Sequence, residues 1–447
     1  MASRKPDTTH FKITRLENGV VVASESLPTI RSASMGVYLD IGSRDESPKT
    51  NGLAHLFEHM VFKGTPKHDA LSIVKSFEAT GGQVNAYTSK EQTCFYAKVV
   101  DTEVSSGLSM LLEMVLESHF DKVDLGKEKE VIIEEIKGGE DNPEDYVYDL
   151  FSEAYFEKHS LGYPIAGSAK TVRGLDRTHL LNHQKKTLRT LPFFVMAVGN
   201  VSHSELVDLT RKSFGISLTS SSAVRIGKNS PTHFNETSAL RHSLKRPGGS
   251  GNPRHLLERR PVHQVTAILG GKGYAWNHPN RYALLILNCI FGDGMSSKLF
   301  QSVRESLGLV YSIYSNPEFL INAGVYSIGF ATEPKDVAKA IREINRQIQA
   351  LKKDGLKTEE MDFAKQNMRG SILLGLESTS TRLANLSRQM MYGQTGENID
   401  SILKKLDKVS KAEIQVAIHD IFQVKDWASA AVIPTKANIS ISKLLDF

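Results

Sequence analysis

Along the first half of the chain, segments with the apolar pattern of a strand are followed by segments with the apolar pattern of a helix. Short runs in which apolar residues alternate or are continuous predict strands, whereas apolar residues three and four apart predict helices. Two strands are expected within residues 11–26, joined by a turn at Glu17-Asn18-Gly19, and a third at 34–41. Two more are expected within 84–100 and one at 193–201. The spacing of these strands leaves room for helices between them.

Helices are expected wherever the period changes to that of a helix. The ranges are 52–60, 71–79, 101–119, 126–136, 144–156, 175–187 and 204–214. Within 126–136, Val131, Ile132 and Ile136 predict a buried stripe. Glu128 and Glu135 are two turns apart and share one face of the same helix.

The second half of the chain repeats the order of elements in the first. A shift of 229 positions brings Asn51 onto Asn280 and Ala54 onto Ala283. The intervening residues are rich in Ser, Gly, Pro, Asn, Lys and Arg, which is typical of an exposed linker. We therefore predict an α+β fold of two homologous halves, each an antiparallel sheet packed with helices. The first half is expected at 1–215, the linker at 216–260 and the second half at 261–447.

One predicted helix carries groups that core packing does not require. His55 and His59 are four residues apart, so they lie one above the other, and Glu58 lies beside them. Two neutral imidazoles at this spacing suit Zn²⁺, and a neighbouring carboxylate can act as a general base. The order H-x-x-E-H is the inverzincin signature. The alternative is an apolar helix whose histidines are exposed or satisfied in the core, and two histidines still lack the usual third ligand.

The repeat bears on this choice. Leu284, Leu287 and Asn288 stand in the second copy where His55, Glu58 and His59 stand in the first. The same helix can therefore be filled without ligands, which favours a site in the first copy.

Composition excludes several classes of protein. Hydrophobic residues are 40% and charged residues 23%, as in globular proteins, and a net charge of +5 without a basic patch does not indicate nucleic-acid binding. Two cysteines cannot form a cysteine zinc site. The polar start and the lack of a long apolar run predict neither a secretory signal nor a membrane span. We therefore expect a cytoplasmic protein.

Two motifs together identify a family. The sequence from His55 to Thr65, HLFEHMVFKGT, and that from Gly81 to Thr88, GGQVNAYT, resemble the pitrilysin-type zinc metallopeptidases. Among these the chain is most similar to bacterial relatives of the mitochondrial processing peptidase β subunit, from about residue 11 to 435.

The resemblance implies further site residues. It places the third zinc ligand at Glu135, with Glu134 as the competitor one residue away, and a second acidic group near the metal at Glu128. It also implies that Arg304 and Tyr311 of the second half hold the substrate and the developing oxyanion across a cleft.

The same resemblance implies an activity. Asn85 and Ala86 match an edge strand that accepts the substrate by strand addition. The expected protein is a clamshell-shaped endopeptidase with one Zn²⁺ per chain, acting on short or unfolded peptides, with presequence-like processing as one role. A homodimer or a heterodimer with a related chain is expected. The alternatives are a non-catalytic structural or assembly subunit and a subunit that is active only with a partner.

Overall fold

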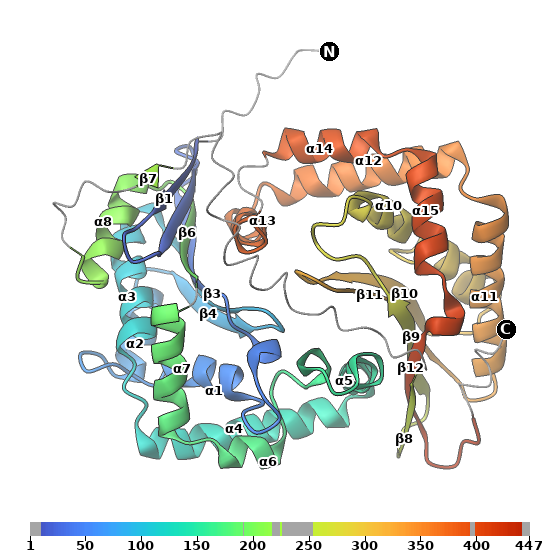
Figure 1. Cartoon of the computed structure of the whole chain (residues 1–447), viewed down its shortest axis with the longest axis horizontal. Coiled ribbons are helices and arrows are strands. Elements are labelled where there is room, and N and C mark those ends of the chain that lie inside the picture. The colour runs from blue at the N-terminus through green and yellow to red at the C-terminus, as the bar shows by residue number, and fades with distance from the viewer. Residues whose placement is uncertain (1–9, 191, 217–223, 226–253, 394–397, 440–447) are drawn as a thin grey trace. The chain divides into compact units, whose positions relative to one another are not determined.

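The computed structural model describes residues 10–190, 192–216, 224–225, 254–393 and 398–439 (Figure 1). The chain forms two compact units, neither of which is one continuous stretch of sequence. The first comprises Met1–Ile136, Pro164–Ser238 and Leu374–Asn398, and the second comprises Lys137–Tyr163, Ala239–Leu373 and Ile399–Phe447.

The first unit is built on a sheet whose seven described strands have the order β4-β5-β3-β6-β2-β1-β7 (Figure 1). The strands are β1 His10–Arg15, β2 Val21–Ser26, β3 Ser32–Leu39, β4 Gln83–Thr88, β5 Thr93–Val100, β6 Phe193–Gly199 and β7 Val224–Arg225. β2 and β6 pair in parallel, and the other described pairs are antiparallel. The predicted strands are confirmed, and Gly19 in the predicted turn has a φ of 88°, which glycine adopts without strain.

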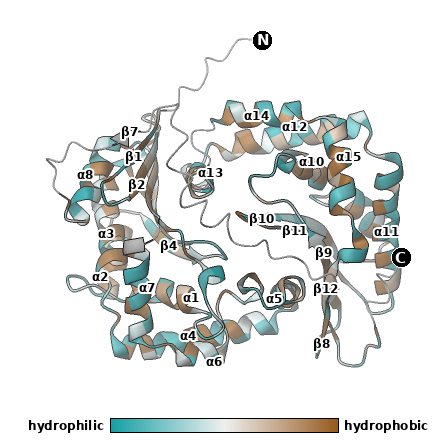
Figure 2. Ribbon diagram, in the orientation of Figure 1, coloured by the Kyte–Doolittle hydropathy of each residue, from teal (hydrophilic) through white to brown (hydrophobic). Residues whose placement is uncertain are grey.

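Helices cover one face of this sheet. They are α1 Leu53–Val61, α2 Ala70–Glu78, α3 Val104–Glu117, α4 Lys122–Asp141, α6 Ala169–Gly174, α7 Arg177–Thr190 and α8 His203–Ser213. Leu56 and Phe57 of α1 and Leu111 of α3 are fully buried in one core with Val37 and Phe95 of the sheet. Each such side chain contributes roughly 1.5–3 kcal/mol through burial. Figure 2 shows α1 largely in the hydrophobic colour, as a helix held inside a core requires.

The buried stripe of α4 differs from the predicted one. Val131 is 44% exposed, whereas Ile132 and Ile133 are fully buried. The buried face of α4 runs through Leu125, Glu128 and Ile132, three and four residues apart, which turns Val131 towards solvent. The true stripe thus includes a carboxylate, which a hydrophobic pattern alone does not count as buried.

The second unit repeats the first sheet with fewer strands. Its described strands are β8 His255–Arg260, β9 Val265–Lys272, β10 Ser312–Phe319, β11 Gly324–Thr332 and β12 Ala428–Pro434, in the order β10-β11-β9-β12-β8. This order matches β4-β5-β3-β6-β2, and the parallel pair β12–β8 matches the parallel pair β6–β2. Its helices are α10 Arg281–Phe291, α11 Val337–Asp354, α12 Thr358–Gly375, α14 Ile399–Lys408 and α15 Lys411–Ile421. The prediction of two homologous α+β halves is confirmed.

The two halves of the sequence exchange one helix each. α5, Pro143–Phe156, lies in the first half, yet its Phe151 and Ala154 pack against Ile268 in the second unit. α13, Thr379–Met391, lies in the second half, yet its Leu386 packs against Met196 on the first sheet. Both sheets are thereby covered on their second face, which accounts for the continuous burial along β6 and β11.

The predicted linker at 216–260 is only partly described. Val224–Arg225 form β7 on the edge of the first sheet, and residues 255–260 are β8 rather than linker. Exposed and half-buried positions alternate along β8, which lies at the edge of the sheet. Because several of these positions are polar, the alternation is not visible as an apolar pattern in the sequence. The remaining linker residues, 217–223 and 226–253, lie outside the described residues. None of the helices within the described residues contains an apolar stretch of the length that a bilayer-spanning helix needs.

Candidate metal centre and catalytic site

α1 presents its two histidines side by side on the face that leaves the core. The ring centroids of His55 and His59 are 4.6 Å apart, and each side chain is 18% exposed. The neighbouring Leu56, Phe57 and Met60 are fully buried, so the helix cannot rotate without losing core contacts. The imidazoles are therefore held in place by the packing of the opposite face.

Glu135 of α4 comes to the same point. Its Oε2 atom lies 3.5 Å from Nε2 of His59 and 4.0 Å from Nε2 of His55. One ligand atom from each of the three residues lies within 4.8 Å of the others. Ligands at about 2.0–2.1 Å from a tetrahedral zinc lie roughly 3.3 Å from one another, so this set of two imidazoles and one carboxylate fits Zn²⁺ with little adjustment.

The two imidazoles differ in their surroundings. Nδ1 of His59 lies 3.1 Å from Oε2 of Glu128, and Lys63 Nζ lies 2.6 Å from Oε1 of the same carboxylate. An ionised carboxylate only accepts hydrogen bonds, so Nδ1 of His59 carries the proton and Nε2 offers its lone pair towards Glu135. Nδ1 of His55 is buried and has no hydrogen-bond partner within the described residues. Burial and the neighbouring His59 lower the pKa of His55 to about 4, so it is neutral and able to ligate a metal.

Glu58 lies beside this cluster with its own partner. Oγ1 of Thr88, at the end of β4, donates a hydrogen bond of 2.5 Å to Oε2 of Glu58. Burial raises the pKa of Glu58 above its usual value, although the Thr88 hydrogen bond opposes this. A carboxylate with a raised pKa is a better proton acceptor, as a general base requires.

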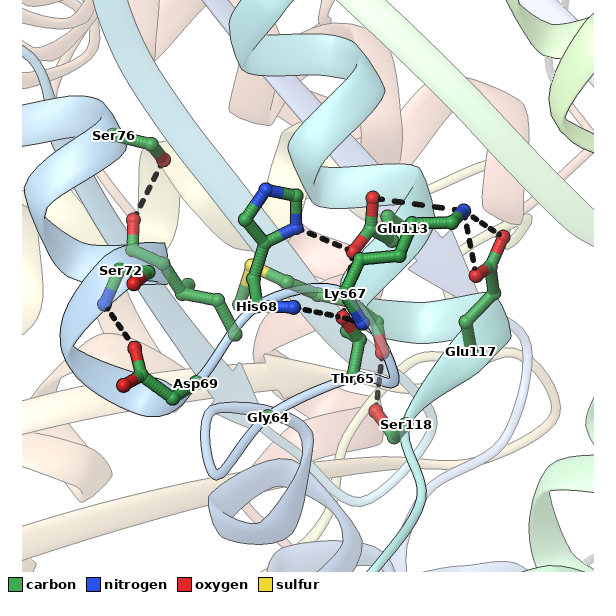
Figure 3. Close-up of polar contacts among 12 residues, drawn as sticks. Gly64, Thr65, Lys67, His68, Asp69, Ser72, Ser76, Glu113, Glu117 and Ser118 are labelled. Carbon is green, nitrogen blue, oxygen red and sulfur yellow. Dashed lines mark hydrogen bonds and ion pairs between the residues drawn. The ribbon is translucent and has the colours of Figure 1, made fainter.

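The loop that follows α1 is fixed to α3 (Figure 3). Thr65 Oγ1 and His68 Nδ1 lie 2.6 and 2.7 Å from Oε1 of Glu113, and Lys67 Nζ lies 2.8 Å from Glu117. Partial burial of Glu113 opposes its ionisation, but the Thr65 and His68 contacts outweigh it and hold the pKa of this carboxyl below its usual value. The C-terminal end of α1 is thus anchored independently of its core face.

Two family comparisons match most of the chain. The family described as insulinase, peptidase family M16, matches residues 21–169, and the peptidase M16 inactive domain matches residues 174–368. The chain is 35% identical over 419 residues to the uncharacterized zinc protease YmxG of Bacillus subtilis, covering 94% of this chain and 97% of that protein. The chain belongs to the peptidase M16 family.

Other relatives and solved structures agree. An uncharacterized zinc protease of Mycobacterium tuberculosis is 35% identical over 435 residues, which cover 97% of this M16 chain and 95% of the relative. The crystal structure of a protease from Helicobacter pylori has a TM-score of 0.83 at 21% identity, covering 95% of this chain and all of that one. A putative M16-like peptidase from Alicyclobacillus acidocaldarius has a TM-score of 0.78 at 20% identity, covering 97% and 100%. These structures support the shared M16 fold.

The predicted substrate-binding residues lie on two separate elements. Asn85 and Ala86 are on β4, the terminal described strand of the first sheet, which pairs there with β5. Arg304 and Tyr311 belong to the second unit, where Arg304 lies in the π-helical segment Phe300–Ser306. Its guanidinium carbon is 5.9 Å from the Tyr311 ring centroid, and Tyr311 is 70% exposed. Their role towards a substrate stays a prediction.

The second copy of the helix is packed as core. Leu284 and Leu287 of α10 are fully buried. Asn288 Oδ1 accepts a hydrogen bond of 2.7 Å from Ser315 Oγ, which in turn accepts one of 2.9 Å from Tyr326 OH. The positions that correspond to His55, Glu58 and His59 are thus filled by apolar and hydrogen-bonded side chains, within the region that matches the peptidase M16 inactive domain.

Sequence reasoning missed two residues of this site. Lys63 lies in the turn after α1, two residues beyond its last residue Val61, and Thr88 ends the GGQVNAYT motif. Both signals were present in the sequence. Their meaning depended on knowing that Glu128 and Glu58 lie within reach.

Proposed function

We propose that this M16 chain is a zinc-dependent endopeptidase that binds one Zn²⁺ through His55, His59 and Glu135. The observation that carries this proposal is the convergence of their ligand atoms beside the Glu58 carboxylate. Its relatives are named uncharacterized zinc proteases, and these names support the same reaction class.

The chain's own residues supply binding, orientation and proton transfer. When bound, zinc would contribute Lewis acidity towards a peptide carbonyl and towards water. Glu58 would take a proton from the attacking water and return it to the leaving amine, with Thr88 holding its carboxylate in place. Glu128 would keep His59 in the tautomer whose Nε2 is free to ligate.

The substrate is proposed to be a short or unfolded peptide. β4 ends the first sheet, so an extended segment could add to it at Asn85 and Ala86 through main-chain hydrogen bonds. A folded protein does not offer such a segment, whereas an unfolded presequence does. Arg304 and Tyr311 are proposed to bind the substrate as well.

The experiment is cleavage of an unstructured, internally quenched peptide by the purified full chain loaded with zinc. We expect cleavage that a chelator abolishes and added Zn²⁺ restores, with Glu58→Gln as the inactive control. A chain that binds one zinc and cleaves nothing by itself would overturn the proposal. Activity that then appears only with an added related chain would identify a partner-dependent subunit, and its absence would identify a structural one.

A further inference from the structure

α1 begins without an ordinary cap. Its N-cap residue is Gly52, which has no side chain to accept a hydrogen bond from the first turn. Gly52 has a φ of 94°, and a Cβ at this position would lie 2.7 Å from the carbonyl oxygen of Ala166. A Ser, Thr, Asp or Asn therefore cannot replace it, and the first amides of the helix need another acceptor.

The acceptor is the side chain of Glu46, which lies six residues before Gly52 in the sequence. Its Oε2 accepts hydrogen bonds from the Gly52 backbone N–H at 2.8 Å and from Asn51 Nδ2 at 2.9 Å. Its Oε1 accepts one from the Ala54 backbone N–H at 2.7 Å. Burial raises the pKa of Glu46 to about 7, while the hydrogen bonds from Ala54, Asn51 and Gly52 act in the opposite direction. The carboxylate is thus buried away from solvent and hydrogen-bonded to the start of this helix.

The segment that carries Glu46 is fixed at its other end to the turn between β4 and β5. The backbone N–H of Ser43 donates to Ser89 O at 3.1 Å, and that of Arg44 donates to Lys90 O at 2.9 Å. The Arg44 guanidinium also forms a buried ion pair with Glu91.

Ser89 directly follows Thr88, the hydrogen-bond partner of Glu58. One short segment therefore connects the strand that holds Thr88 to the helix that holds the histidines.

We propose that Glu46 is a positioning residue, a remote cap that fixes the start of α1 and thereby sets His55 against Glu135. Ala54, whose amide it holds, directly precedes His55. The proposal rests on the proposed zinc site, and it assigns Glu46 no contact with substrate or metal.

The test compares zinc affinity in Glu46→Ala, Glu46→Gln and the unaltered full chain, by competition with a chromophoric chelator at pH 8, where the carboxylate is ionised. We expect the zinc dissociation constant to rise at least tenfold in Glu46→Ala. Glu46→Gln keeps one acceptor oxygen and should show a smaller rise. Asp69→Ala is the matched control, because Asp69 caps α2 by accepting from the Ser72 amide, and α2 carries no proposed ligand. It should lower the thermal midpoint yet leave the zinc dissociation constant within twofold.

Amide hydrogen exchange in the zinc-free protein provides the second readout. Faster exchange at Gly52 and Ala54 in Glu46→Ala, with the core of the first unit still protected, would support the cap. An unchanged zinc dissociation constant, or continued protection of the Ala54 amide, would overturn the proposal. Failure of the unaltered chain to bind zinc would refute the proposed function instead, and the exchange data would still decide whether Glu46 caps α1.

Discussion

Nδ1 of His59 lies 3.1 Å from Oε2 of Glu128, a carboxylate that α4 contributes from 69 residues further along the chain. The other oxygen of this carboxylate contacts the Lys63 ammonium. Glu128 is thus the link between a proposed zinc ligand and a cation in the turn that follows the ligand's helix.

Glu128→Gln is expected to weaken zinc binding. The amide lacks the charge that favours the Nδ1–H tautomer of His59, and it leaves Lys63 without its anion. Loss of such an outer partner lowers metal affinity by about 10- to 100-fold. Chelator competition measures the change, and Glu130→Gln, an exposed site on the same helix, is the control. Equal zinc affinity in both variants would contradict this role of Glu128.

Glu58→Gln is expected to separate catalysis from metal binding. The amide cannot accept the proton, so kcat should fall by about 10²- to 10⁴-fold, the usual contribution of a general base. Elemental analysis should still find one zinc per chain. Thr88→Val keeps the carboxylate but removes the hydroxyl that orients it, so a smaller fall in kcat is expected. Peptide cleavage by Glu58→Gln at the unaltered rate would show that another group is the base.

Glu135 and its neighbour Glu134 can be told apart by zinc content. Glu135 has an oxygen within reach of both Nε2 atoms, and the next residue along a helix points about 100° away. After dialysis against buffer without zinc, Glu135→Ala should retain well under one zinc per chain, whereas Glu134→Ala should retain it. The opposite pattern would transfer the ligand role to Glu134.

The exchanged helix α13 is expected to stabilise the first unit. Leu386 is 3% exposed and packs on the sheet with Val21 and Met196, so Leu386→Ala should lower the free energy of unfolding of that unit by about 2–5 kcal/mol. Leu71→Ala, at a position 60% exposed on α2, should change it by less than about 0.5 kcal/mol. Urea unfolding followed by circular dichroism measures both variants. Similar values for the two would mean that α13 adds little to this unit.

His183 is expected to make stability fall in acid. It is buried against Phe57 with Nε2 unpartnered among the described residues, and burial, followed by the charge of Lys186, lowers its pKa to about 4. The unfolded chain, with a histidine pKa near 6.5, binds this proton more readily, so stability is lost as pH falls below about 6.5 and levels off below about 4. Between pH 7 and 5 the loss from this group is about 2 kcal/mol.

The check is the slope of unfolding free energy against pH. His183→Leu removes the titrating group while remaining apolar, so its slope between pH 7 and 5 should be shallower than that of the unaltered chain. His203, whose pKa burial also lowers to about 4, remains in both proteins and contributes equally. Parallel slopes would show that His183 does not cause this loss of stability in acid.

Short-range patterns in the sequence predicted most of the elements. The turn at Gly19, the two strands within 84–100 and the helix predicted at 144–156 all follow from local rules on glycine, alternation and helical period. The buried stripe predicted for α4 was wrong at Val131, because the buried face includes Glu128, a charged residue that a hydrophobic pattern does not count. A carboxylate is buried when a partner satisfies it, and the partners, His59 and Lys63, are more than 60 residues away.

The sequence by itself determined the two homologous halves, because the order of elements repeats directly along the chain. It also determined the spacing of His55, Glu58 and His59, because that spacing lies within a single helix. Tertiary structure alone decided that α5 and α13 exchange sheets, that Glu135 rather than a neighbour faces the histidines, and that Glu46 holds the start of α1. Each of these depends on which distant segments share a core. That choice follows from the summed burial of many side chains, which no local stretch of sequence records.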